Sequence, residues 1–469
     1  MMSNAPQFAV VGHPNKGKSS IVATLSLDDS VAIARTSGTT KQSQSFPMKV
    51  DGQLMYELID TPGFQRARKA LAWMQNEAEK VRDRPAVVKR FVETWKDSGK
   101  FIDECELLTP IIEGAGIIYV VDGSRPYGEE YEAEMEILRW TGQPSMALIN
   151  PIDHSEYVEE WRTALNQYFK ITRLFNAMTV EFHKRIDILN AFGQLHEAWR
   201  QPLQQAVNSL AKMREQQHRQ AARIIAKMVV EMCGYVEEKK IGSESNPHSY
   251  ESVMKENFLN ALRKLEKKGR QQVQKSYQHH HLKSEETTFE LLGGDLFAMK
   301  DWYFWGLDKV QLTAISMAAG ASAGLAVDAV AGGTSLLLGA ATGGFLSGAG
   351  VWLMADKIAK QKISGILPLG GKLLSFGPVT NRNFPYVLLG RAIYHQKLIA
   401  GRPHAQRDEL QLQQEASSNW LSTLPPEPRK QLDKLCKKLS NQQKPEETQE
   451  ALSGWICQIF CEIEENKAA

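Results

Sequence analysis

The sequence predicts an α/β fold with a mainly parallel sheet in the N-terminal part, followed by a mainly helical C-terminal region with an Ala/Gly-rich helical hairpin. In the first 200 residues, short apolar runs alternate with amphipathic helical patterns, as in parallel sheets covered by helices on both faces. From about residue 181 to residue 270, apolar residues recur at helical spacing through a charged sequence. Residues 310–355 are rich in alanine and glycine and contain one charged residue.

The chain has 469 residues, which is enough for two or three domains that each bury a core. We expect a domain at residues 1–200 with a helical insertion at about 64–114. A helical stalk or linker at 201–290 and a C-terminal helical domain at 291–469 are expected to follow. The net charge of +2 argues neither for nor against a nucleic-acid partner.

The cysteines and the first residues of the chain predict a cytoplasmic protein. The five cysteines are scattered and form no Cys-x-x-Cys pair, so free thiols in a reducing compartment are expected. The first seven residues form a short polar stretch without the apolar core of a secretory signal.

A glycine-rich turn separates the first apolar run, at residues 8–11, from a helical pattern at residues 20–27. The turn reads Gly-x-x-x-x-Gly-Lys-Ser, and such a turn directs backbone N–H groups toward one point at the start of a helix. We expect Lys18 to reach the β- and γ-phosphates of a nucleoside triphosphate and the Ser19 hydroxyl to hold Mg²⁺. The predicted nucleotide-binding residues of this turn are Gly12, His13, Pro14, Asn15, Lys16, Gly17, Lys18, Ser19 and Ser20.

A second motif, Asp60-Thr61-Pro62-Gly63, follows the strand-like residues 54–59. A carboxylate at the end of this strand can bind Mg²⁺ through water, so Asp60 is a predicted metal ligand. The Gly63 N–H can meet a γ-phosphate and lose that contact after hydrolysis, which predicts a loop with two states.

Two further motifs predict that the base is guanine. Asn150-Pro151-Ile152-Asp153 follows the strand-like residues 146–149, and Asp153 could accept hydrogen bonds from guanine N1–H and N2–H₂ together. Asn176 and Ala177 end a later apolar run, where a backbone N–H could contact guanine O6. Asn150, Asp153, Asn176 and Ala177 therefore join the predicted nucleotide-binding residues.

The order and spacing of these motifs resemble the TrmE–Era–EngA group of GTPases. The matching residues are the turn at 12–20, Gly38-Thr39-Thr40-Lys41, and Asp60 to Phe64, and the resemblance covers roughly the first 200 residues. It implies a P-loop GTPase domain that binds GTP and GDP and hydrolyses GTP with Mg²⁺. It also implies that Thr40 is the switch threonine that binds Mg²⁺ beside Ser19 and Asp60. The expected catalytic residues are Lys18, Thr40, Gly63 and Asn15.

The sequence departs from that group at three positions. Pro151 replaces the usual lysine of the base-reading motif, so guanine affinity is expected to be reduced. Asn176 replaces the commoner serine, which is a mild change. Phe64 stands where Ras-like proteins carry a water-orienting glutamine, so intrinsic turnover is expected to be slow.

Two features could assist hydrolysis. The resemblance implies that Asn15 can coordinate a potassium ion that bridges the phosphates, although Asn15 could instead only brace the loop. Arg66 and Arg68 follow the switch directly and could act on the phosphates or be solvated. The helical insertion at 64–114 is attached to this switch, so it could be an effector or self-association surface or a simple elaboration of the core. A homodimer through the GTPase domains is one consequence of self-association.

The hairpin at 310–355 has two uncharged arms, 310–327 and 329–355, each near or above the length that crosses a bilayer as a helix. Glycines recur at four-residue spacing, and tryptophan and lysine flank the hairpin, as in membrane helix pairs. This pattern predicts contact with a membrane or a membrane partner at the inner face of the cell membrane. A buried hairpin in a soluble domain is the alternative, which Asp328 and the low helix propensity of glycine favour.

Most of the chain resembles a bacterial family of Era-like GTPases whose C-terminal domain is of unknown function, although the resemblance is much weaker after residue 200. Three functions stay open: a membrane-coupled GTPase switch, a ribosome-assembly GTPase, and a low-turnover scaffold in the manner of dynamin-like proteins. The second would need an RNA-binding module such as a KH domain. The sequence contains no convincing Gly-x-x-Gly loop between apolar helices, so a nucleic-acid partner is not supported.

Overall fold

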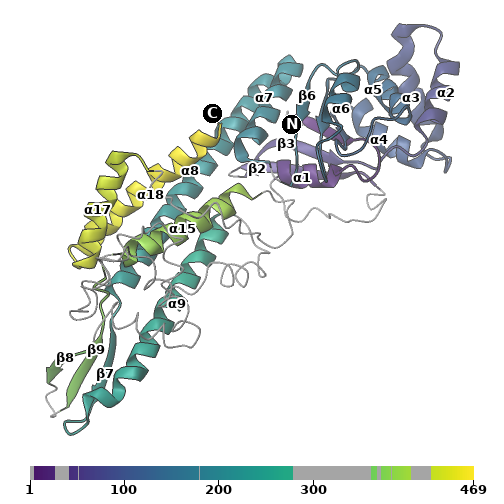
Figure 1. The fold of residues 1–469 in the computed structure, drawn as a ribbon. Coiled ribbons are helices and arrows are strands. Elements are labelled where there is room, and N and C mark those ends of the chain that lie inside the picture. Colours follow the sequence, from purple (N-terminus) through teal and green to yellow (C-terminus); the bar gives the residue numbers. More distant parts are fainter. Residues whose placement is uncertain are drawn as a thin grey trace, which may run out of the picture. The chain divides into compact units, whose positions relative to one another are not determined.

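The computed structural model describes residues 5–26, 42–50, 52–178, 180–277, 361–366, 371–381, 383–402 and 424–468. The chain divides into two compact units (Figure 1). Unit 1 comprises Met1–Arg214 and Gly401–Arg407, and unit 2 comprises Glu215–Ala400 and Asp408–Ala469. The predicted hairpin at 310–355 lies outside the described residues, and the boundaries expected at 200 and 290 stay predictions.

Unit 1 is built on a six-stranded sheet in the order β2-β3-β1-β4-β5-β6. Neighbouring strands are parallel except for the edge pair β2 and β3, which is antiparallel. The predicted α/β fold with a mainly parallel sheet is confirmed. The strands are β1 (Gln7–Val11), β2 (Gln44–Val50), β3 (Gln53–Asp60), β4 (Gly116–Val121), β5 (Ser145–Ile149) and β6 (Thr172–Leu174).

Helices cover both faces of this sheet (Figure 1). Successive side chains of a strand point to opposite faces, and both sets are apolar here, so each face needs a cover. Ala9 and Val11 of β1 belong to one hydrophobic cluster, and Phe8 and Val10 belong to the other. The helices are α1 (Lys18–Ser26), α2 (Ala67–Glu77), α3 (Arg84–Trp95), α4 (Ile102–Ile112), α5 (Glu130–Trp140), α6 (Val158–Leu165), α7 (Phe182–Leu195) and α8 (Glu197–Gly234), within which the division between the units falls.

The segment between β3 and β4 forms the helices α2, α3 and α4, with a short 3₁₀ turn η1 (Val81–Asp83) before α3. Pro85 lies in the first turn of α3, where its missing N–H costs no helical hydrogen bond. The three helices share an aromatic cluster in which Trp73 lies 5.4 Å from Phe91, and Phe101 lies 5.4 Å from Trp95, between ring centroids. We call residues 64–114 the helical insertion.

Unit 2 is mainly helical and contains a small antiparallel sheet in the order β7-β9-β8. The strand β7 interrupts the region 181–270 that the sequence predicts as almost entirely helical. Its partner β9 comes more than 100 residues later, so no local signal marks the pairing. The elements are β7 (Glu237–Ile241), η2 (Pro247–Tyr250), α9 (Glu251–Ser276), β8 (Gln361–Ile366), β9 (Lys372–Phe376), α15 (Phe384–Gly401), α17 (Pro426–Ser440) and α18 (Pro445–Ala468).

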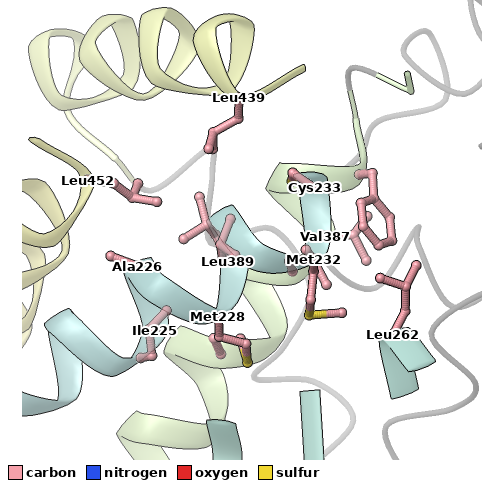
Figure 2. Packing of buried hydrophobic residues seen from close by; sticks show 14 of the residues in the cluster. Ile225, Ala226, Met228, Met232, Cys233, Leu262, Val387, Leu389, Leu439 and Leu452 are labelled. Atoms are coloured by element: carbon pink, nitrogen blue, oxygen red, sulfur yellow. The ribbon is translucent and has the colours of Figure 1, made fainter. Parts of the chain in front are cut away.

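One hydrophobic cluster joins the helices of unit 2 (Figure 2). Met228 of α8, Leu262 of α9, Leu389 of α15 and Leu452 of α18 all belong to it and are at most 5% exposed. The apolar stripe predicted on α8 therefore faces a packed core. Within the part of the chain that the structure describes, no helix combines the length and apolar character needed to cross a membrane.

A buried ion cluster links two helices of this core. Glu266 of α9 accepts a hydrogen bond from Arg391 Nε at 2.6 Å, and Arg270 Nη1 lies 3.2 Å from the same carboxylate. Burial by itself raises the pKa of Glu266, but Arg391 and Arg270 outweigh this effect and lower the pKa. The carboxylate is therefore charged at neutral pH, and its removal from water is offset by these two bases.

We expect Arg391→Met to destabilise unit 2 by about 3 kcal/mol at neutral pH, because it leaves Glu266 with incomplete compensation in the core. The matched control is Lys430→Met, which breaks an exposed pair with Glu427 and should change stability by less than about 0.5 kcal/mol. Urea denaturation followed by tryptophan fluorescence measures both. Equal midpoints for the two variants would contradict the assigned role of the cluster.

Candidate nucleotide site

The glycine-rich turn joins β1 to α1 and has a backbone that only certain residues accept. Gly12 has φ +143°, and a Cβ there would clash with the carbonyl oxygen of Val120 on β4. Asn15 has φ 62°, a left-handed conformation that asparagine tolerates better than most residues. The backbone of the turn therefore packs directly against β4, at the carboxyl end of β1.

Lys18 is a buried cation of this turn. Its Nζ donates to the carbonyl oxygens of Gly12 at 3.3 Å and His13 at 3.2 Å, so the ammonium lies across the loop. Burial lowers the pKa of Lys18, and the carboxylate of Asp60 acts in the opposite direction. A phosphate group in the loop would meet an ammonium that is already positioned.

The two described residues of the predicted metal site meet at this end of the sheet. Ser19 Oγ donates to Asp60 Oδ2 at 2.7 Å, and Asp60 is 4% exposed at the end of β3. A hydroxyl and a carboxylate are the hard oxygen donors that Mg²⁺ prefers, so the pair fits the expected ion. Thr40, the third predicted ligand, lies outside the described residues.

The second motif lies directly against the glycine-rich turn. Thr61 Oγ1 donates to the carbonyl oxygen of Val10 at 2.8 Å, which holds the end of β3 beside β1. A Cβ on Gly63 would lie 2.6 Å from the backbone N of Pro14, so only glycine allows this approach. Phe64 is 1% exposed and packs in the cluster under the helical insertion, where it cannot orient a water molecule.

Hydrogen bonds connect the turn to the predicted base-reading loops. Asn150 donates from Nδ2 to the carbonyl oxygen of Lys16 at 3.1 Å and accepts at Oδ1 from the N–H of Ala177 at 3.3 Å. Asn176 Nδ2 donates to the carbonyl oxygen of Pro151 at 2.9 Å. Asp153 is exposed on the same loop. The structure thus brings the three loops together, with the Ala177 N–H already bonded to Asn150.

Two interacting pairs beside the turn involve buried acidic residues that the sequence motifs do not include. Glu134 of α5 is 2% exposed; it bonds to His13 Nδ1 at 2.8 Å and accepts from the Tyr119 hydroxyl at 2.9 Å. Burial raises the pKa of Glu134, and the bond to His13 opposes that effect. Lys16 directs its Nζ to within 3.8 Å of Asp122. A glutamate on the apolar side of an amphipathic helix was the available signal for Glu134.

Together, this fold and this site define unit 1 as a P-loop GTPase domain. Residues 7–150 match the family model described as 50S ribosome-binding GTPase. Residues 162–459 match the model described as Domain of unknown function (DUF3482), which spans more than half of the chain. The chain belongs to this DUF3482 family. Membership of the TrmE–Era–EngA group, which the motifs resemble, stays a prediction.

Curated relatives match only a short stretch. GTPase Der of Mycoplasma pneumoniae is 43% identical over 63 residues, which is 13% of this chain and 14% of that protein. GTPase Der of Lactobacillus helveticus is 42% identical over 62 residues, with the same coverage. The chain therefore spans about a seventh of the length of these relatives.

Solved structures show a more distant likeness. An Aquifex aeolicus Era variant bound to GDP·AlF₄⁻ is 14% identical, with a TM-score of 0.27, over 58% of this chain and 88% of that chain. Era in complex with MgGDPNP and nucleotides of 16S ribosomal RNA is 15% identical, with a TM-score of 0.26 and coverage of 58% and 89%.

We expect Lys18→Ala to abolish measurable binding of guanine nucleotides, because it removes the ammonium from the phosphate loop. Isothermal titration calorimetry with GTP and GDP in the presence of magnesium measures the change. Lys49→Ala, on the exposed face of β2, is the control and should bind as the unaltered chain does. Retained affinity in the Lys18 variant would show that the site is wrongly assigned.

Proposed function

We propose that the protein binds GTP with Mg²⁺ and hydrolyses it to GDP and phosphate, and that it acts as a molecular switch. The observation that carries this proposal is the convergence of three elements at one edge of the sheet. The Lys18 ammonium lies across the loop, Ser19 meets Asp60 at 2.7 Å, and Gly63 lies against Pro14. The family match over residues 7–150 supports the same activity.

In this proposal each residue has a separate role. Lys18 and the backbone N–H groups of the turn bind the phosphates, and Ser19, Thr40 and Asp60 hold the metal. A bound Mg²⁺ would supply positive charge that neutralises the negative charge developing on the phosphates. The Gly63 N–H contacts the γ-phosphate before hydrolysis and loses that contact afterwards, so the loop changes state with the nucleotide.

Hydrolysis in this chain needs help that Phe64 cannot give. The phenyl ring is buried, so no side chain at that position orients the attacking water. Asn15 is exposed at the turn, where its amide could ligate a potassium ion beside the phosphates. The left-handed backbone at this position favours asparagine even without a bound ion. An experiment can separate ion binding by Asn15 from its role in bracing the loop.

We expect hydrolysis to be at least about tenfold faster in potassium than in sodium, because a potassium ion would supply the charge of an arginine finger. Asn15→Gly keeps the left-handed backbone accessible and removes the amide, so this variant should lose the difference between the two salts. Phosphate release at equal ionic strength measures the rates. A potassium effect that persists in Asn15→Gly would assign Asn15 to bracing the loop.

The base-reading loop provides a second test. Asp153→Asn replaces an acceptor of two guanine hydrogen bonds by an amide, so GTP should bind about tenfold or more weakly and xanthosine triphosphate relatively better. Competition binding of the two nucleotides measures this shift. The exposed Glu156→Gln on the same loop is the control. An unchanged base preference in Asp153→Asn would place base recognition elsewhere.

The partner of the switch is a separate part of the proposal. We propose a membrane or membrane partner on the basis of residues 310–355, which lie outside the described residues. The description of the family matched by residues 7–150 favours the ribosome as the second candidate. Pelleting of the full chain with anionic liposomes, with ribosomes and alone, each with GTP analogue or GDP, distinguishes them. Sedimentation alone with the analogue would instead favour a self-assembling, low-turnover scaffold.

A further inference from the structure

Helix α4 of the helical insertion carries a buried glutamate that faces the switch. Glu104 is 1% exposed, and its Oε1 accepts hydrogen bonds from the backbone N–H groups of Gln65, at 2.9 Å, and Arg66. These two N–H groups directly follow Phe64 and lie at the start of α2. A side chain from one helix therefore caps the beginning of another.

The same helix is bonded to the other switch-proximal segment. The Ser43 hydroxyl donates to the carbonyl oxygen of Glu106 at 2.9 Å, and the Ser43 N–H lies 3.4 Å from the Glu106 carboxylate. Ser43 immediately precedes β2 and comes two residues after the Gly38 to Lys41 motif. Helix α4 thus contacts the chain just after both predicted switch motifs.

The buried carboxylate of Glu104 has a specific electrostatic role. Taking a carboxylate out of water is costly unless it is hydrogen-bonded, and among the described residues no ion pair with a base compensates it. Helix α2 has no acidic residue in its first turn, and Arg66 at its N-cap makes no side-chain cap. Glu104 supplies the negative charge that the N-terminal end of this helix favours.

We propose that Glu104 is a positioning residue for the hydrolysis of GTP, and that α4 couples both switches to the helical insertion. The inference rests on the proposed function. Gly63 lies against the phosphate loop and is only two residues from Gln65, whose N–H is bonded to Glu104. Glu104 therefore limits the positions that the Gly63 N–H can take. A shift of either switch pulls on the same helix through Glu104 or through Ser43.

The experiment compares Glu104→Ala, Glu104→Gln and the control Glu113→Ala, an exposed glutamate at the end of the same helix, in the full chain. Steady-state phosphate release gives kcat and KM, and a fluorescent nucleotide analogue gives the ratio of GTP to GDP affinity. We expect Glu104→Ala to lower kcat about tenfold or more and to reduce the preference for GTP over GDP, with GDP affinity within about twofold. Glu104→Gln keeps an oxygen acceptor but removes the negative charge, so it should recover only part of the lost kcat.

A cap that only stabilises α2 would lower the melting temperature and leave kcat and the affinity ratio of the folded protein unchanged. That result, or a kcat within twofold of the unaltered chain in Glu104→Ala, would overturn the inference. If Glu104→Ala does not fold, Glu104→Gln and Ser43→Ala provide the same readouts, and wild-type values in both would overturn it. An unaltered chain that binds no GTP would instead refute the proposed function.

Discussion

The parallel pairing of β1 with β3 on one side and β4 on the other is the constraint on which unit 1 depends. Val10 pairs with Asp60 and Val11 with Tyr119, so the three strands end at the same edge of the sheet. The chain leaves each strand there, and the loops are forced to meet. The Ser19–Asp60 bond and the contact between Gly63 and Pro14 follow from this register, since a slip of one residue would turn Asp60 to the other face.

The helical insertion extends this arrangement beyond the minimal site. Its helices pack on the face of the sheet that buries Phe64, and they begin immediately after the predicted switch. Because Glu104 and Ser43 bond α4 to the segments on both sides, the insertion is part of the structure around the site. The buried Phe64 side chain anchors these helices to the sheet.

The parts that could be predicted are those in which local sequence determines local geometry. The turn from Gly12 to Ser19 requires its glycines and lysine at fixed spacing, so the strand, the loop and the helix around it are all predictable from the sequence. The partners of Glu104 and Glu134 could not be predicted in this way, because they lie far away in the chain. For Glu134 the sequence shows only a glutamate on the apolar side of its helix. The strand β7 is not predictable for the same reason, since its four consecutive charged residues show no apolar face and its partner β9 lies far away in the chain.

The aromatic cluster of the helical insertion also provides an intrinsic fluorescence probe. Trp73 on α2 and Trp95 on α3 have ring centroids 6.4 Å apart in an edge-on arrangement. Emission from an indole depends on its immediate neighbours, so a small rotation of α2 against α3 alters the brightness and colour of this pair. If the proposed switch moves α2 against α3, the natural fluorescence of the chain would report nucleotide exchange with no dye attached.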